Sequence, residues 1–150
     1  MVTIRDAVPA DLAELHEVYR ASSLSNEGDR ANLLANPDAL EYPGIAAGDG
    51  RTRVAVAADG RIAGFATSLM AGDAVELDDL FVDPGWMRRG VGRALVADAV
   101  TIARQWGARR IEVTANPHAH AFYQRAGFVA GHEVQTRFGP GSRMHLDVVP

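Results

Sequence analysis

Residues 82 to 95 read V-D-P-G-W-M-R-R-G-V-G-R-A-L, so that an apolar run ends at Asp83-Pro84 and a loop of glycine and arginine leads into an amphipathic segment. This order predicts a strand, a turn and the start of a helix. The first N–H groups of a helix lack partners and carry partial positive charge, which attracts anions. Gly90 and Gly92 leave no side chain between an anion and those groups, so the segment is predicted to bind a pyrophosphate. Further positive charge comes from Arg88, Arg89 and Arg93.

Two other phosphate-binding motifs do not fit the spacing. A P-loop would place Lys and then Ser or Thr after Gly85-x-x-x-x-Gly90, where the chain has Val91 and Gly92. A dinucleotide fingerprint that starts at Gly90 would need Gly or Ala at position 95, where Leu95 stands. Neither motif is therefore present in this segment.

The loop resembles the acyl-CoA loop of the GNAT superfamily of N-acyltransferases, whose pattern is Gln/Arg-x-x-Gly-x-Gly/Ala after a strand. Here the pattern falls on residues 87 to 92, with Met87 in place of the usual Gln or Arg. This departure removes one side-chain contact but leaves the backbone donors. The alternative is that Gly-x-Gly only tightens a strand-to-helix turn. The resemblance implies that acetyl-CoA is the acyl-donor cosubstrate, bound by Leu80, Phe81, Val82, Met87, Arg88, Arg89, Gly90, Val91, Gly92 and Arg93.

Residues 116 to 128 read N-P-H-A-H-A-F-Y-Q-R-A-G-F and resemble a second GNAT signature, Asn-x-x-Ala-x-x-Phe/Leu-Tyr-x-x-x-Gly-Phe. Apolar side chains at three- and four-residue spacing predict a short helix that ends at Gly127. The resemblance implies that Asn116, Phe122 and Tyr123 contact the cosubstrate. It also makes the Tyr123 hydroxyl the acid that protonates the leaving thiolate, because a phenol and a thiol differ by only about two pKa units. Alternatively, Tyr123 is an ordinary half-buried aromatic residue.

Hydrophobic periodicity along the chain predicts a single domain over residues 1–150. Predicted strands cover residues 3–5, 53–58, 62–69, 75–82, 110–114, 128–136 and 144–148, and predicted helices start at Pro9, cover 29–34 and 91–106, and include the short helix before Gly127. This order is that of the GNAT fold. The resemblance therefore implies an α/β (mixed α+β) domain, whose central, mostly antiparallel sheet of about six to seven strands is flanked by about four helices and splayed between strands 4 and 5.

Composition limits the function further. The formal net charge is −4, which argues against a nucleic-acid partner. The N-terminus lacks a leader pattern and apolar stretches fall short of the ~20 residues that span a bilayer, so no membrane association and a cytoplasmic location are expected. The chain has no cysteine, so we expect direct attack by the acceptor amine in a ternary complex rather than an acetyl-cysteine intermediate. His118 and His120 have no carboxylate at a helpful spacing, so no metal is expected.

Amide formation needs a polarised thioester carbonyl and a base for the amine. The resemblance implies that the Leu80 N–H polarises the carbonyl, at a bulge where the strand splays near residues 80–82. The same strand offers three acids as the base, in the order of preference Glu76, Asp78 and Asp79. In a regular strand Glu76 and Asp78 share a face with Leu80, and Asp79 points the other way. Alternatively, these acids are solvated or only attract a cationic amine, and a water chain replaces a dedicated base.

The acceptor is the least determined part of the site. The resemblance places it against residues 22–30 and 135–143, where Glu27 and Asp29, together with Asp79, would form an acidic approach that favours a cationic amine. We therefore expect an N-acetyltransferase that moves the acetyl group of acetyl-CoA to a primary amine of a small molecule or peptide. The alternative function is a non-catalytic acyl-CoA-binding or regulatory module. The closing hairpin is the surface on which a homodimer would form.

Overall fold

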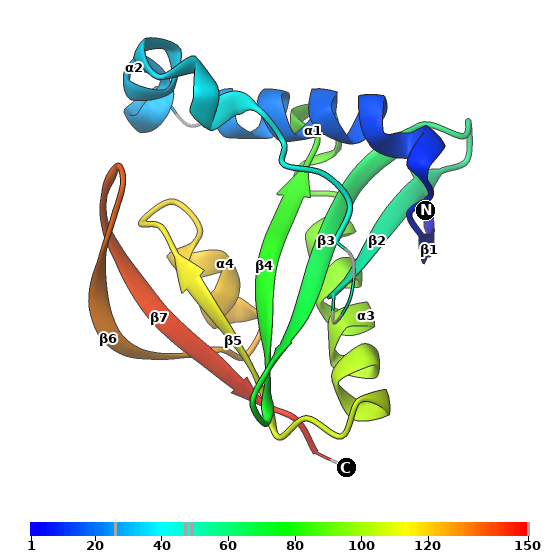
Figure 1. Ribbon diagram of the computed structural model, residues 1–150, viewed down its shortest axis with the longest axis vertical. Helices are drawn as coiled ribbons and strands as arrows, with labels where there is room; N and C mark the ends of the chain where they lie inside the picture. The colour runs from blue at the N-terminus through cyan, green and yellow to red at the C-terminus, as the bar shows by residue number, and fades with distance from the viewer. Residues whose placement is uncertain (26, 47, 49, 150) are drawn as a thin grey trace.

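The computed structural model describes residues 1–25, 27–46, 48 and 50–149, and for residues 27–29 it describes the backbone alone. The strands are β1 (Val2–Asp6), β2 (Gly50–Ala57), β3 (Ile62–Ala71), β4 (Ala74–Val82), β5 (Arg110–Ala115), β6 (Val129–Thr136) and β7 (Gly139–Asp147). The helices are α1 (Leu12–Leu24), α2 (Glu27–Ala35), α3 (Val91–Gln105) and α4 (His120–Arg125), with 3₁₀ turns η1 (Pro9–Asp11), η2 (Pro37–Leu40) and η3 (Pro84–Trp86) (Figure 1). No helix in the described ranges has the length and apolar character needed to cross a bilayer.

The described strands form one seven-stranded sheet in the order β1-β2-β3-β4-β5-β7-β6. Its one parallel pair is β4 with β5, and this pair extends only over residues 74–76 against 110–112. Beyond Glu76 the two strands separate, as Figure 1 shows by the widening space between them. The predicted mixed, mostly antiparallel sheet with a splay between strands 4 and 5 is therefore confirmed. The splay begins earlier than the predicted residues 80–82.

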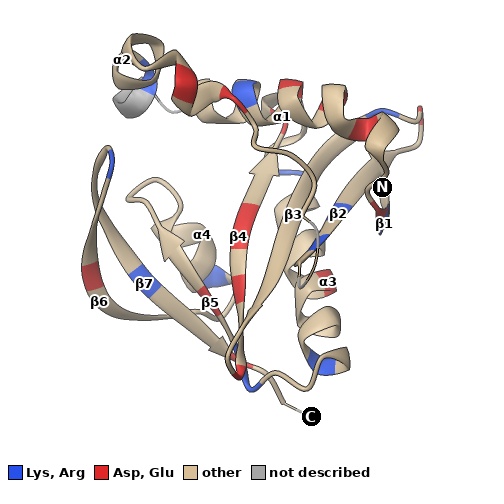
Figure 2. Ribbon diagram, viewed as in Figure 1, with Lys and Arg blue, Asp and Glu red and all other residues tan. Residues whose placement is uncertain are grey.

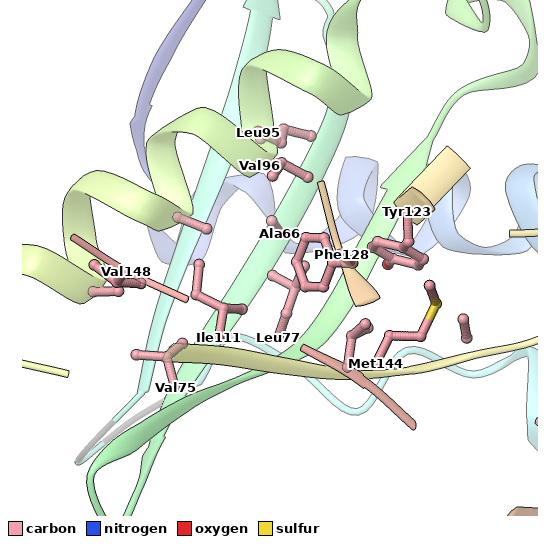
Figure 3. Close-up of a cluster of buried hydrophobic side chains, with 14 of the residues drawn as sticks. Ala66, Val75, Leu77, Leu95, Val96, Ile111, Tyr123, Phe128, Met144 and Val148 are labelled. Carbon is pink, nitrogen blue, oxygen red and sulfur yellow. The ribbon is translucent and has the colours of Figure 1, made fainter. Parts of the chain in front are cut away.

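Helices cover both faces of the sheet and bury a core on each. On one face α3 contributes Val91, Leu95 and Ala99 to a core that also holds Tyr123 of α4 (Figure 3). This stripe repeats every three or four residues, as an amphipathic helix requires. On the other face α1 packs Leu15 and its neighbours against an aromatic group centred on Phe65 of β3. The sheet thus separates an α3–α4 side from an α1 side.

A bulge in β4 changes which of its side chains share a face. Opposite β3, Thr67 pairs with Asp79 but Ser68 pairs with Leu77, so Asp78 is the extra residue. After the bulge Leu80 packs into the same core as Leu77, while Phe81 joins the aromatic group on the α1 side. The expectation that Glu76 and Asp78 share a face with Leu80 is wrong, because it assumed a strand without an extra residue.

Candidate active site

A cavity of about 1000 Å³ lies where β4 and β5 separate. The end of β4, the turn after it and the start of α3 line one wall, with Leu80, Phe81, Val82, Trp86, Met87, Arg88, Gly90, Val91, Gly92 and Arg93. The α4 region supplies Asn116, His118, Ala119, Phe122, Tyr123 and Arg125, and the α1 side with the β6–β7 turn supplies Tyr19, Ser22, Ser23, Leu33, Ala39, Arg137 and Phe138. The two sequence motifs therefore meet in one cavity.

All the residues predicted to bind the cosubstrate are among these lining residues except Arg89. The Arg89 guanidinium instead stacks on the ring of Trp86, 5.2 Å from its centroid. The lining of the cavity by the other residues agrees with a role in binding, and their contacts with a bound molecule stay predictions.

The loop before α3 has an unusual backbone at two positions. Gly90 is the N-cap of α3 and adopts φ +82°, a left-handed conformation that glycine tolerates. Arg88 adopts φ +63°, although a side chain makes this region costly by about 1–2 kcal/mol. Non-glycine residues held in this region are frequent at ligand sites. The loop is therefore shaped at some cost to present the first turn of α3 to the cavity.

Gly92 is required by packing rather than by conformation. A Cβ atom on Gly92 would lie 3.0 Å from the Cε1 and Cζ atoms of Phe122. The structure shows that Gly92 makes room for the Phe122 ring, which joins the start of α3 to α4. The role predicted from the sequence, room for an anion at the first turn of α3, stays a prediction.

The strand β4 directs part of its backbone toward the splay. The Asp83 N–H donates to the Ala63 carbonyl of the β3 side at 2.8 Å. Because N–H groups along a strand alternate in direction, the N–H groups of Leu80 and Val82 point away from β3. The paired residues of β5 end opposite Glu76, so these two N–H groups face the cavity side of the splay.

Tyr123 belongs to the core and also lines the cavity. The residue is 6% exposed, and its ring packs edge-on against Phe128 (Figure 3) and against Phe122, with centroids 5.2 Å apart in each case. Burial raises the pKa of Tyr123 well above its usual value, so the phenol stays protonated. This widens the expected gap of about two units between the phenol and a thiol. Nearby, Asn116 accepts the Ala119 N–H at 2.9 Å and holds the start of the α4 segment.

Glu76, the acid placed first among the predicted bases, forms a bidentate ion pair with Arg143. Its two carboxylate oxygens accept hydrogen bonds from the two terminal nitrogens of Arg143, at 2.8 and 2.9 Å. Arg143 also donates to the Thr114 hydroxyl at 2.9 Å and lies 3.7 Å from Glu112. Figure 2 shows acidic positions on β4 and a basic position on β7, with β5 between these two strands. This arrangement favours a structural role for Glu76.

Asp79 has the electrostatic character of a base. The pKa of Asp79 rises to about 6, first because the side chain is partly buried, with a smaller rise from the neighbouring Asp78 and an opposing hydrogen bond from Thr67. A carboxylate with this pKa can accept a proton near neutral pH. Asp79 is not among the described lining residues, but it lies two positions before Phe81, which does line the cavity. Asp78 is exposed at the bulge.

The far wall of the cavity includes parts of both segments predicted to hold the acceptor. Ser22 and Ser23 belong to the first segment, and Arg137 and Phe138 belong to the second. Arg137 also bridges to Asp38 of η2, with both N–O distances 3.1 Å. The side chains of residues 27–29, and with them the predicted contributions of Glu27 and Asp29, lie outside the described residues.

Several lining residues were not singled out from the sequence. Trp86 lies inside the quoted motif and Phe138 lies inside a segment predicted to hold the acceptor, so the position of each in the sequence could have marked it as a site residue. Tyr19 had none, because its spacing marks it only as part of the apolar face of α1. Within the described residues, no three His, Cys, Asp or Glu side chains lie together as a metal site would need. The expected absence of a metal stays a prediction.

Comparisons with known proteins agree with this geometry. The profile of the Acetyltransferase (GNAT) family matches residues 12–128. An aminoglycoside N(6′)-acetyltransferase type 1 from Stenotrophomonas maltophilia is 30% identical over 138 residues, which cover 84% of this chain and 85% of that protein. A streptothricin acetyltransferase from Streptomyces lavendulae is 41% identical over 85 residues, 53% of this chain and 45% of that protein, so the match spans less than half of that relative.

A solved structure shares the fold over nearly the full length. The PaiA N-acetyltransferase from Thermoplasma acidophilum, crystallised in complex with coenzyme A, superposes with a TM-score of 0.73 and 20% sequence identity. The superposition covers 98% of this chain and 99% of that chain. At this identity the likeness shows the fold alone.

Proposed function

The chain belongs to the GNAT family of acetyltransferases, and from this premise we propose that it transfers the acetyl group of acetyl-CoA directly to a primary amine. One observation carries the proposal. A single cavity joins the glycine-arginine loop at the start of α3 to the free edge of β4 and to Tyr123. An anion site, backbone donors and an acid are the three elements that acyl transfer from a coenzyme A thioester needs.

The residues present fit acetyl-CoA along this cavity. The N–H groups of the first turn of α3, with Arg88 and Arg93, would hold the pyrophosphate. The edge of β4 would hold the pantetheine through the Val82 N–H group, since no strand in the described residues pairs with β4 on that side beyond Glu76, and the Leu80 N–H group is left for the thioester carbonyl. Acetyl-CoA supplies an activated thioester. Met87 leaves one side-chain contact of the family pattern unmade, and we expect the backbone donors to compensate.

The amine must lose a proton before it can attack. At pH 7 only about one part in a thousand of an alkyl amine with pKa near ~10.4 is neutral. We propose Asp79 as the group that accepts this proton, through one water, because its pKa near 6 leaves it largely ionised at neutral pH. Glu76 is less suited, because Arg143 already occupies both of its oxygens.

The remaining steps use two further groups, the Leu80 N–H and the Tyr123 hydroxyl. The amine nitrogen bonds to the carbonyl carbon, and the Leu80 N–H stabilises the resulting oxyanion. The carbon–sulfur bond then breaks, and the leaving sulfur takes the proton of the Tyr123 hydroxyl. The new amide nitrogen gives its second proton to the Tyr123 oxygen. The net products are the acetamide, coenzyme A and the one proton held by Asp79.

We propose a cationic small-molecule amine as the acceptor. Asp79 carries negative charge within electrostatic reach of Tyr19, which lines the α1 side of the cavity, and this favours a cation. The names of two relatives, one for streptothricin and one for an aminoglycoside, support a small molecule over a peptide. A cytoplasmic location and a homodimer through the β6–β7 hairpin stay predictions.

The test is release of coenzyme A thiol from acetyl-CoA, measured against streptothricins, aminoglycosides, polyamines, amino acids and peptide N-termini. The chain has no cysteine, so the protein contributes no thiol of its own. Amine-dependent release with a preference for the cationic small molecules is expected. No release across the panel, with coenzyme A binding measured by calorimetry, would overturn the transferase and support the non-catalytic binding module.

A further inference from the structure

Two buried threonines stand in a row with Asp79 across three neighbouring strands. Thr52 of β2 lies opposite Thr67 of β3, and Thr67 lies opposite Asp79 of β4. The two threonine side chains are buried, with 4% and 2% exposure, and their hydroxyl oxygens are 3.1 Å apart. Valine has the same shape as threonine without a polar atom to satisfy. Packing alone therefore does not explain why two buried hydroxyl groups stand beside a carboxylate at these positions.

The surrounding groups set the direction of the hydrogen bonds in this row. The Thr52 hydroxyl oxygen accepts the Ala46 N–H at 3.2 Å. An ionised carboxylate can only accept, so the Thr67 hydrogen is directed to Asp79. The Thr67 oxygen is then left to accept from the Thr52 hydroxyl. The buried phenol of Tyr42 is a further polar neighbour of both hydroxyls, and the acceptor at the end of the row is Asp79.

We propose that Thr52 and Thr67 are positioning residues that hold the Asp79 carboxylate in place and supply it with an oriented hydroxyl donor. The proposal rests on the proposed role of Asp79 as the base. A donor to the ionised form favours ionisation, so the row opposes the effect of burial on Asp79. In a polar chain of this kind each bond strengthens the next. The row therefore keeps a partly buried carboxylate available as a proton acceptor near neutral pH.

Other groups face Asp79 and must be held constant in any test. On its own strand Asp78 is adjacent, and the phenols of Tyr19 from α1 and Tyr42 after η2 lie within electrostatic reach. Both phenols keep a raised pKa because they are buried, so neither changes charge in the pH range where Asp79 titrates. The ion pair of Glu76 and Arg143 lies on the same face of the sheet. Against the larger effect of burial, the hydroxyls of both threonines lower the pKa of Tyr42. A valine at either position therefore also raises the pKa of Tyr42, which is already above its usual range and stays outside the range where Asp79 titrates.

The decisive measurement is the pKa of the Asp79 carboxyl group, from carbon-13 NMR of the full chain labelled at aspartate. We expect Thr67→Val to raise this pKa by about one unit and Thr67→Ser to restore it. Thr52→Val should move it in the same direction by a smaller amount, since Thr67 keeps its own hydroxyl. Ser68→Ala is the matched control, because Ser68 is the next residue of β3, equally buried, and faces the opposite core.

The outcomes separate this proposal from the proposed function. An Asp79 pKa that rises in Thr67→Val and returns to its original value in Thr67→Ser supports the positioning role of the threonines. This holds whether or not the acid limb of the kcat/KM profile shifts by the same amount. If the profile fails to follow, the row stands and Asp79 is not the base. An Asp79 pKa in Thr67→Val and Thr52→Val equal to that of the unaltered chain would overturn the row. Should Thr67→Val not fold, Thr52→Val decides the question with the same readout.

Discussion

Arg143 of β7 reaches past β5 and binds both carboxylate oxygens of Glu76 on β4, at 2.8 and 2.9 Å. The pair lies where the parallel contact of β4 with β5 ends. A bidentate arginine–carboxylate pair fixes geometry as well as charge. Glu76 and Arg143 therefore link β4 to β7 where the splay begins, and this ion pair occupies both carboxylate oxygens of the acid that the sequence placed first as a base.

Replacing Glu76 by Gln should weaken its ion pair with Arg143 and leave the proposed base, Asp79, in place. We expect a loss of about 1 kcal/mol in the free energy of unfolding, because the pair is partly exposed, and an unchanged pH dependence of kcat/KM. Urea denaturation and pH–rate profiles measure the two effects. Glu112→Gln is the control, since Glu112 is 3.7 Å from Arg143 and should cost less. Loss of the acid limb in Glu76→Gln alone would return Glu76 to the mechanism.

Asp79→Asn should remove the proposed base. We expect kcat/KM to fall by about 10²- to 10⁴-fold at pH 8. In the unaltered chain the rate should rise with pH through a pKa of about 6 and then level off. Asp78→Asn is the control, because Asp78 is exposed at the bulge and should change the rate far less. A pH profile that survives in Asp79→Asn would rule out Asp79.

The same substitution should stabilise the protein at high pH. The pKa of Asp79 is about 6 in the fold, against about 3.9 in an unfolded chain. The folded state therefore binds more protons between these values, and stability is lost as pH rises through this window. At pH 8 Asp79→Asn should be more stable than the unaltered chain by up to about 3 kcal/mol, and at pH 3.5 the difference should vanish. Denaturant midpoints at the two pH values test this, and an equal difference at both would contradict it.

Tyr123→Phe should separate catalysis from binding. The ring keeps its packing against Phe122 and Phe128, so stability and coenzyme A affinity should stay nearly constant. We expect kcat to fall by about 10²-fold or more, since the acid for the leaving sulfur is gone. Stopped assays and calorimetry give the two quantities. An unchanged kcat would show that another donor or water protonates the thiolate.

Gly92→Ala should disturb the contact between α3 and α4. The new methyl group would lie 3.0 Å from the Phe122 ring, and such overpacking costs about 1–3 kcal/mol. We expect weaker coenzyme A binding as Phe122 shifts. Adding Phe122→Leu should recover stability if the clash is the cause. If the double variant is no more stable than Gly92→Ala alone, the backbone of the first turn rather than the ring is what the glycine serves.

The two motifs were readable from the sequence because each acts through local geometry. The loop before α3 depends on which positions lack side chains, and the Tyr123 helix depends on spacing over a few residues. The bulge at Asp78 is set by the register of β3 against β4, which alternation along one strand cannot show. The contact of Glu76 with Arg143 joins residues 67 positions apart. Spacing along one strand cannot show this contact, and Glu76 was therefore placed first among the candidate bases although Arg143 binds both of its carboxylate oxygens.

The parallel contact of β4 with β5 is three residue pairs long, so among the described residues the part of β4 from Leu77 to Val82 has β3 on one side and no paired strand on the other. A bound donor molecule lying there would take the place of a missing strand and complete the hydrogen bonding of the sheet. Any ligand that binds only the folded state raises stability by mass action. The amount of protein that survives proteolysis in a cell would then follow the supply of acyl donor, and starvation for acetyl units would lower the abundance of the enzyme as well as its rate.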